Sequence, residues 1–159
     1  MKIKNYKLVL NKENRLPQLV EEPTCEYSCG DGTIDQPEKI VKICNTVFHL
    51  SDLAEEHTIL LAVGGSGKLL GVFELSHGNN SGSIVDPKSI MIRLLLTNAT
   101  AFAIVHNHPS GRCEPSRIDV ETTKRLKQAA DLMDFLLLDH IIIGDGKYRS
   151  MREAGDCEF

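Results

Sequence analysis

Two histidines, a serine and an aspartate lie close together in the second half of the sequence, at a spacing that can bind one divalent metal ion. His106 and His108 are two residues apart, so at the end of an extended strand their side chains would emerge on the same face. Asp119 follows a loop of proline, serine and glycine, near the start of a segment with helical periodicity. Two imidazoles and one carboxylate are the ligands expected of a catalytic zinc ion whose fourth position is left to water.

Each of these features also has a simpler explanation. Ser116 and Asp119 stand at the N-cap and N3 positions of the expected helix, close to a capping box that needs no metal. A strand that ends in His-x-His can bury one imidazole and expose the other. The two patterns together, around the tight polar loop 109–111, favour a metal site. We interpret Cys113 as an incidental loop thiol, because a thiolate ligand would occupy the position that a hydrolytic zinc needs for water.

A hydrolytic zinc site needs a general base, and it gains from a hydrogen-bond donor for the oxyanion. The candidates for the base are Glu55, Glu56 and Glu74. Glu56 lies just before the expected strand 58–63 and could reach the mouth of the site, whereas Glu74 could equally be a solvent-facing charge. Ser116 could donate to the oxyanion in addition to capping its helix.

The pattern of apolar residues predicts a single α/β domain in which helices flank a mixed sheet. Strands are expected at residues 3–10, 58–63, 69–75, 101–105, 135–143 and 148–151, and helices are expected to begin at Pro37, Pro87 and Ser116. The glycine-rich segment 64–68 is expected to be a hairpin turn, because the glycine spacing and the following helix of a phosphate-binding loop are missing. We expect residues 1–36 to form an N-terminal strand and an irregular arm, and residues 37–159 to form the domain that binds metal.

The overall composition fits one globular domain and excludes several classes of protein. The chain has 159 residues, of which 42% are hydrophobic and 25% are charged. The net charge of -4 and the pI of about 5.8 provide no general positive field for a nucleic acid. No segment resembles a signal peptide or spans a bilayer, so we expect a cytoplasmic protein without a membrane partner.

The five cysteines are scattered and odd in number, which is typical of reduced thiols in a cytoplasm. Cys25 and Cys29 are the only close pair. A second zinc site would need two more ligands at a similar spacing, and none lies nearby, so the pattern disfavours such a site. A homo-oligomer is compatible with the sequence, which does not define the number of copies.

The same residues carry a family resemblance. His106 and His108, then seven residues, Ser116, two more residues and Asp119 match the His-x-His-x7-Ser-x-x-Asp signature, and the chain thereby resembles the JAMM (MPN+) metalloproteases. The phrases His-Asn-His-Pro-Ser-Gly and Leu-Asp-His-Ile-Ile-Ile-Gly look like the RadC branch of that group. The resemblance covers about residues 50–153 and implies a JAB/MPN-like domain, with an architecture like that of cytidine deaminases.

This resemblance also implies roles for individual residues. His106, His108 and Asp119 would bind Zn2+, Glu56 would be the general base, and Ser116 would assist the oxyanion. The implied activity is zinc-dependent hydrolysis of a peptide or isopeptide bond in a peptide or protein substrate. RadC-like proteins usually carry a helix-hairpin-helix DNA-binding region before this domain, and the first fifty residues do not show one.

Two other functions stay open at this point. The chain could be an accessory protein of DNA repair or of a mobile element, acting on DNA or on a partner bound to DNA. A local basic patch for direct DNA binding is conceivable from Arg112, Lys124, Arg125 and Lys127, although a solvated helix face explains these residues more simply. The chain could instead be a non-catalytic scaffold, as in family members without the metal ligands, but the intact ligand set argues against that function.

Overall fold

A five-stranded mixed sheet forms the centre of the protein, with the strand order β4-β3-β5-β6-β7. The computed structural model describes residues 3–11, 13–14, 16–22, 32–77 and 85–159. The strands are β3 (His57–Val63), β4 (Leu69–His77), β5 (Ala101–Asn107), β6 (Leu136–Gly144) and β7 (Lys147–Ser150). β5 and β6 are parallel and the other neighbours are antiparallel, which confirms the predicted mixed sheet.

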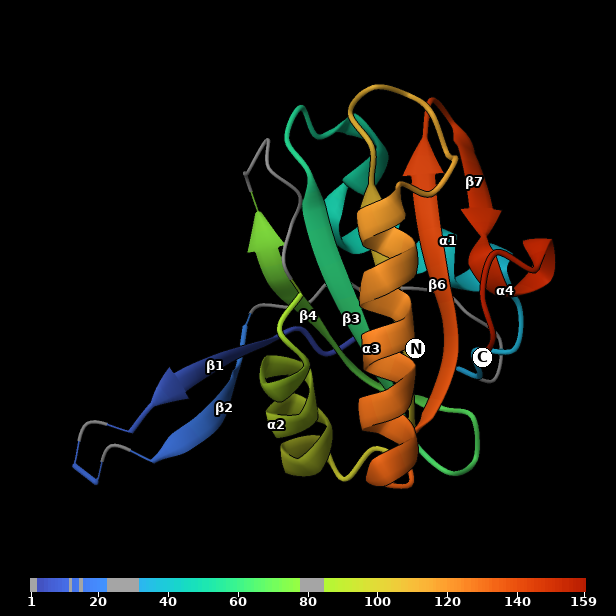
Figure 1. Ribbon diagram of the computed structural model, residues 1–159. Coiled ribbons are helices and arrows are strands. Elements are labelled where there is room, and N and C mark those ends of the chain that lie inside the picture. Colours follow the sequence, from blue (N-terminus) through green and yellow to red (C-terminus); the bar gives the residue numbers. More distant parts are fainter. Residues whose placement is uncertain (1–2, 12, 15, 23–31, 78–84) are drawn as a thin grey trace.

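Helices cover both faces of this sheet (Figure 1). They are α1 (Pro37–Phe48), α2 (Pro87–Thr97), α3 (Arg117–Leu132) and the short α4 (Met151–Ala154), with a 3-10 turn at Leu50–Asp52. α2 and α3 lie on one face and α1 lies on the other (Figure 1). Proline opens both α1 and α2, where its missing N–H is not needed by the helix. None of the helices in the described residues is long and apolar enough to cross a membrane.

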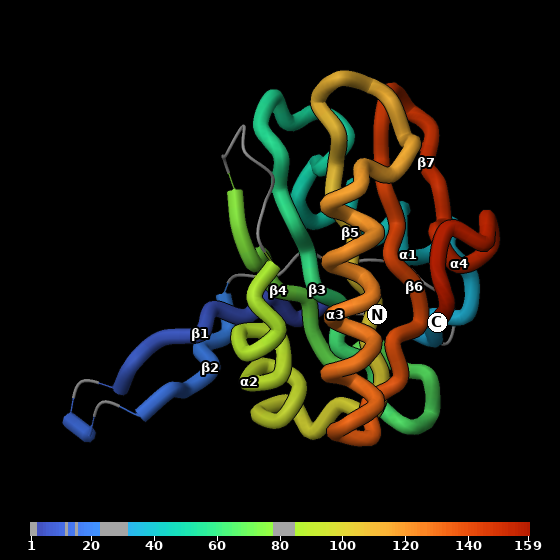
Figure 2. The backbone as a smooth tube through the Cα atoms, viewed as in Figure 1, coloured from blue at the N-terminus to red at the C-terminus, as the bar shows by residue number. Residues whose placement is uncertain are grey.

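Successive side chains of the central strands point to opposite faces of the sheet, so the core has two layers, one on each face. Ile59 and Leu61 of β3 pack in the layer that contains α1, whereas Leu60 packs in the layer that contains α2 and α3. Figure 2 shows β5 between β3 and β6, beneath α3. Because every residue of β5 is buried, each polar side chain on it must find a partner inside the protein.

The N-terminal segment contains a second, smaller sheet that the sequence only half predicts. β1 (Tyr6–Leu10) pairs with β2 (Pro17–Glu21), and the hairpin projects away from the main sheet (Figure 1). The expectation of an irregular arm is wrong for β2, because cross-strand pairing with β1 satisfies its backbone despite its weakly apolar sequence. Ile3 and Ile34 are buried in the α1 layer, so this segment also contributes to the core.

The last strand is shorter than the apolar pattern indicates. β7 ends at Ser150, and Met151, expected in the strand, instead begins α4. The Ser150 hydroxyl accepts a hydrogen bond from the Glu153 N–H, so it caps this helix and ends the strand. The same Ser150 hydroxyl donates its own proton to the buried Asp139 carboxylate, with an O–O distance of 2.5 Å.

Candidate metal centre

The candidate site lies where β5 ends and α3 begins. β5 carries His106, and the chain then turns through the loop that contains His108 before it enters α3. The His108 N–H donates to the Ile143 carbonyl at 2.8 Å, which holds the loop beside β6. Gly144 lets this loop pack closely, because a Cβ atom there would lie 2.7 Å from the backbone of Gly111. Backbone contacts with β6 therefore fix the position of the loop.

The three predicted ligands converge at this point. The Nε2 atoms of His106 and His108 are 3.0 Å apart. Nε2 of His106 is 3.3 Å from Oδ1 of Asp119, and Nε2 of His108 is 3.6 Å from Oδ2 of the same carboxylate. Within the described part of the chain, these residues form the one group of at least three histidines, cysteines or acids that could hold a metal ion.

The surrounding hydrogen bonds orient these groups for a cation. Nδ1 of His108 lies 2.8 Å from the Arg112 carbonyl, which can only accept, so Nδ1 carries the proton of a neutral ring and Nε2 keeps its lone pair. The Ser116 N–H donates to Oδ2 of Asp119 at 2.6 Å, and the Asp119 N–H donates to the Ser116 hydroxyl at 3.2 Å. The capping box therefore exists, and it fixes the carboxylate that faces the histidines.

Burial and mutual contacts shift the pKa values of all three groups. Burial, with help from His140, lowers the pKa of His106 well below its ordinary value. The Asp119 carboxylate would accept a proton from Nε2 of a charged His108 ring, and this contact is the main cause that raises the pKa of His108. Burial would raise the pKa of Asp119, but contacts with His108, His106 and Ser116 together hold it well below its usual range. A carboxylate that stays ionised beside a neutral buried imidazole suits metal binding.

The three candidate bases occupy different positions. Thr58 pairs with His106 across the sheet, and Glu56 precedes Thr58 by two residues, so an extended backbone directs Glu56 to the same face. Glu56 is half-buried, and its charge contributes to the raised pKa of His108. Glu55 is exposed, and its backbone carbonyl accepts a hydrogen bond from Asn107.

Glu74 lies on the other face of the sheet. It pairs with Ile59, whose side chain packs in the α1 layer, and its Oε1 atom is 2.6 Å from Nδ1 of His57. The α1 face is opposite to the one that bears His106, because residues on neighbouring positions of a strand point to opposite sides. The geometry therefore favours Glu56 over Glu74 as the acid nearest the cluster.

Ser116 is exposed at the start of α3. Its oxygen accepts the helix-capping hydrogen bond from Asp119, so its own O–H proton is available to donate elsewhere. Cys113 is outside the group that could hold a metal ion, and its Sγ donates to the Gly144 carbonyl at 3.4 Å. Cys25 and Cys29 lie outside the described residues.

Three buried polar residues around the cluster received no role from the sequence motifs, although His140 and Asn107 lie within them. His140 and Thr123 form hydrogen bonds behind His106, with Nδ1 of His106 2.9 Å from Nε2 of His140. Asn107 donates to the Leu53 and Glu55 carbonyls and accepts from the His57 N–H, so it fastens the segment that carries Glu56. For Asn107 and His140 the available signal was a polar residue within an apolar strand, which predicts a buried hydrogen bond but not its partner, whereas Thr123 lies in α3 and carries no such signal.

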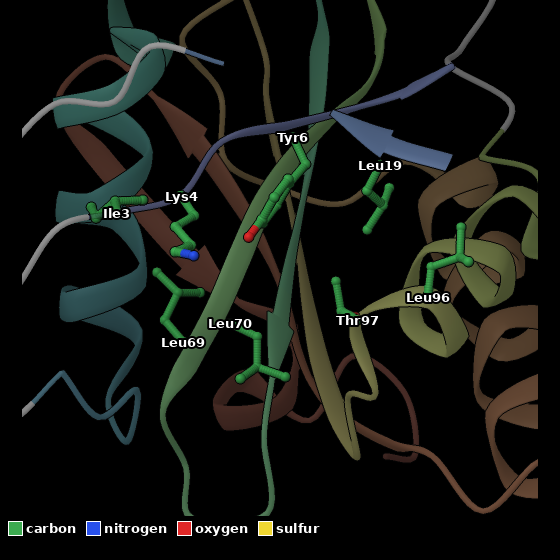
Figure 3. A pocket seen from close by; sticks show the side chains of 8 residues that line it. All are labelled: Ile3, Lys4, Tyr6, Leu19, Leu69, Leu70, Leu96 and Thr97. Atoms are coloured by element: carbon green, nitrogen blue, oxygen red, sulfur yellow. The ribbon is translucent and has the colours of Figure 1, made fainter. Parts of the chain in front are cut away.

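Two of the cavities in the described residues lie at different ends of the molecule, and a third, of about 470 Å³, is lined by residues of α1, β6 and α4. One, of about 430 Å³, opens beside His108 and is lined by Asn107, the 109–112 loop and the 3-10 turn. Another, of about 540 Å³, lies at the base of the β1–β2 hairpin, where Lys4 and Tyr6 face β4 and α2 (Figure 3). None of the predicted ligands or catalytic residues lines the hairpin cavity. Among these cavities, the one beside His108 is the one lined by a residue of the cluster.

Comparison with known proteins assigns the family. A profile described as the RadC-like JAB domain matches residues 34–156. The chain belongs to the RadC-like JAB domain family. This match covers the sheet, the loop after β5 and all of α3, so the resemblance in the ligand motif extends over the fold that positions it.

Curated relatives are similar over the same region. The chain is 38% identical to a UPF0758 protein of Pelobacter propionicus over 108 residues, which are 68% of this chain and 47% of that protein. It is 37% identical to UPF0758 proteins of Geobacter sulfurreducens and Acidithiobacillus ferrooxidans, over 75% and 82% of this chain. The alignments cover 51% and 57% of those two proteins. The chain thus spans about half the length of these RadC-like relatives, whose names state no activity.

Proposed function

We propose that this RadC-like JAB domain is a zinc-dependent hydrolase that cleaves peptide or isopeptide bonds. The observation that carries the proposal is the convergence of two imidazole nitrogens and one carboxylate within 4.8 Å of one another. Because Nδ1 of His108 is bound to a carbonyl, the group presents acceptors to the centre of the cluster, and a cation would relieve their mutual repulsion. Borderline nitrogen and oxygen ligands of this kind suit zinc.

In this proposal, different residues bind the metal, transfer the proton and stabilise the oxyanion. A bound zinc ion would lower the pKa of water and polarise the substrate carbonyl. His106, His108 and Asp119 would hold the ion. Glu56 would accept the proton of the attacking water and pass it to the leaving amine, and Ser116 would donate its O–H to the developing oxyanion. The cavity of about 430 Å³ beside His108 would receive the substrate chain.

The test combines zinc content with hydrolysis by variants of two adjacent glutamates. We expect wild type to hold about one zinc per chain and to cleave members of a library of peptides and lysine-linked isopeptides. Glu56→Gln should retain the zinc and lower kcat/KM by about 100- to 10,000-fold, because it removes the proton acceptor. Glu55→Gln is the matched control, since it removes an exposed charge one residue away.

Three outcomes would contradict the proposal. The first is wild type that binds no zinc after reconstitution, which would favour a scaffold. The second is zinc-loaded protein that cleaves DNA and none of the peptides or isopeptides, which would favour a role in DNA processing. The third is equal activity of the Glu56→Gln and Glu55→Gln variants, which would remove Glu56 from the mechanism.

A further inference from the structure

A chain of buried hydrogen bonds connects two of the proposed zinc ligands behind the site. It runs from Nδ1 of His106 to Nε2 of His140 at 2.9 Å, and from Nδ1 of His140 to the Thr123 hydroxyl at 2.6 Å. The Thr123 hydroxyl then contacts the backbone carbonyl of Asp119 at 2.7 Å. The three side chains are at most 2% exposed, so they must satisfy one another without solvent.

The Asp119 carbonyl, at the end of this series of hydrogen bonds, determines which group donates in each of them. A carbonyl oxygen cannot donate, so the Thr123 hydroxyl must donate to Asp119, or two oxygens would face each other at 2.7 Å without a proton. The sulfur of Met151, at 3.7 Å, is a weaker and more distant acceptor for this hydroxyl. The hydroxyl oxygen therefore accepts from Nδ1–H of His140, and Nε2 of His140 accepts from Nδ1–H of His106.

We propose that His140 and Thr123 are positioning residues that hold His106 in the tautomer whose Nε2 lone pair faces the metal. This inference rests on the proposed function for its purpose. With the opposite direction of hydrogen bonds, Nε2 of His106 would carry a proton, and a metal would have to displace it before binding. Outer hydrogen bonds of this kind typically change metal affinity by about 10- to 100-fold.

The position of His106 explains why a side chain has to serve as its acceptor. His108 lies in the loop, where the backbone carbonyl of Arg112 can reach its Nδ1 atom. His106 lies within β5, which pairs with β3 on one side and β6 on the other, so neighbouring carbonyls are used by the sheet. His140 of β6 supplies the missing acceptor from the same face of the sheet.

The decisive comparison is between Thr123→Val and Thr123→Ser. Valine keeps the shape of threonine but removes the hydroxyl, whereas serine keeps the hydroxyl. We expect Thr123→Val to weaken zinc binding by about 10- to 100-fold in competition with a chelator. Thr123→Ser should stay within about threefold of wild type, because it retains the hydrogen bonds. Thermal unfolding of both metal-free variants separates a loss of zinc affinity from a loss of folded protein.

A second measurement reads the tautomer directly, without metal or substrate. Nitrogen-15 NMR of the imidazole rings in the metal-free protein should show His106 protonated at Nδ1 in wild type and in Thr123→Ser, with this preference reduced in Thr123→Val. Protonation of His106 at Nε2 in wild type, or equal zinc affinities of the two variants, would overturn the inference. Failure of the hydrolase proposal would appear separately, as zinc-loaded protein that cleaves no peptide or isopeptide while the tautomer result holds.

Discussion

Among the described residues, two clusters combine two histidines with one carboxylate, and they differ in the exposure of the carboxylate and in the direction of the imidazole nitrogens. In the first, His106, His108 and Asp119 have side chains that are 3%, 17% and 13% exposed. In the second, His57 and His77 approach Glu74, whose side chain is 41% exposed. Both clusters have the same chemical composition, so composition does not explain why only the first suits a metal.

The difference lies in where the Nδ1 atoms point. In the second cluster, Nδ1 of His57 is 2.6 Å and Nδ1 of His77 is 4.0 Å from the same oxygen of Glu74. The carboxylate is therefore occupied by the imidazoles themselves. In the first cluster, His140 and the Arg112 carbonyl bind the Nδ1 atoms, so both Nε2 atoms turn toward Asp119. A metal site thus depends on the outer hydrogen bonds of its histidines as much as on their identity.

Removing one histidine from each cluster should give the largest contrast. His108→Ala should weaken zinc binding by roughly 1,000-fold, because the loss of a ligand exceeds the effect of an outer hydrogen bond. His77→Ala should leave zinc content unchanged. Elemental analysis after dialysis against a chelator of moderate affinity measures both. Retention of zinc by His108→Ala together with its loss from His77→Ala would reverse our assignment of the two clusters.

The pH dependence of folding should also separate the two clusters. Burial lowers the pKa of His140 from 6.5 to about 4 in the folded state, so the unfolded chain binds the proton more tightly. The stabilisation is complete above pH 6.5 and is lost as the pH falls from there to about 4. Since one pKa unit corresponds to about 1.4 kcal/mol, the loss approaches about 3 kcal/mol.

Chemical denaturation of the metal-free protein between pH 7 and 4 measures this loss. Burial also lowers the pKa of His106, which adds a contribution of the same sign. His140→Gln should flatten the dependence, whereas His77→Gln should not, since the His77 side chain is 69% exposed. A slope that His140→Gln leaves unaltered would show that another group dominates the acid response.

The sequence predicts the convergence of the three candidate ligands better than it predicts their surroundings. His106, His108 and Asp119 belong to one short segment, where strand and helix periodicity place them together. His140 and Thr123 come from β6 and the middle of α3, and their contact depends on the packing of α3 across the sheet. No local pattern encodes that packing, so tertiary structure was needed to find these two partners.

The sheet and the N-terminal hairpin show the same limit. The long apolar runs of β3 and β6 predict their strands because these residues are buried on both faces. β2 is mostly exposed, and its hydrogen bonds depend on β1 rather than on its own apolar content. A strand that is stabilised mainly by hydrogen bonds to its neighbour, and not by its own apolar residues, is therefore poorly predicted from composition.

A substitution of Asn107 should have an effect of intermediate size, because its side chain holds the backbone segment that lies between the two clusters. Its side chain binds the backbone of Leu53, Glu55 and His57, so Asn107→Ala should loosen the position of Glu56. We expect kcat to fall by about tenfold with unchanged zinc affinity, because misplacing a catalytic group by a fraction of an ångström has effects of this order. The imidazole of His57 is not part of this contact, so His57→Gln is the control.

Steady-state kinetics and zinc titration of the two variants separate the explanations. A fall in zinc affinity in Asn107→Ala would mean that Asn107 supports the ligands on either side of it rather than the segment that carries Glu56. A loss of kcat in His57→Gln equal to that in Asn107→Ala would mean that the second cluster contributes to catalysis through its side chains.

The smallest effect is expected from the ion pair of the second cluster itself. Glu74→Gln removes the charge that faces His57, and we expect the free energy of unfolding to change by less than about 1 kcal/mol, because solvent screens a pair whose acid is 41% exposed. Denaturation of wild type and Glu74→Gln at pH 6, with and without 0.5 M salt, measures this contribution. A loss of several kcal/mol, insensitive to salt, would mean that Glu74 acts as a buried structural group, and the contrast between the clusters would then rest on hydrogen-bond direction alone.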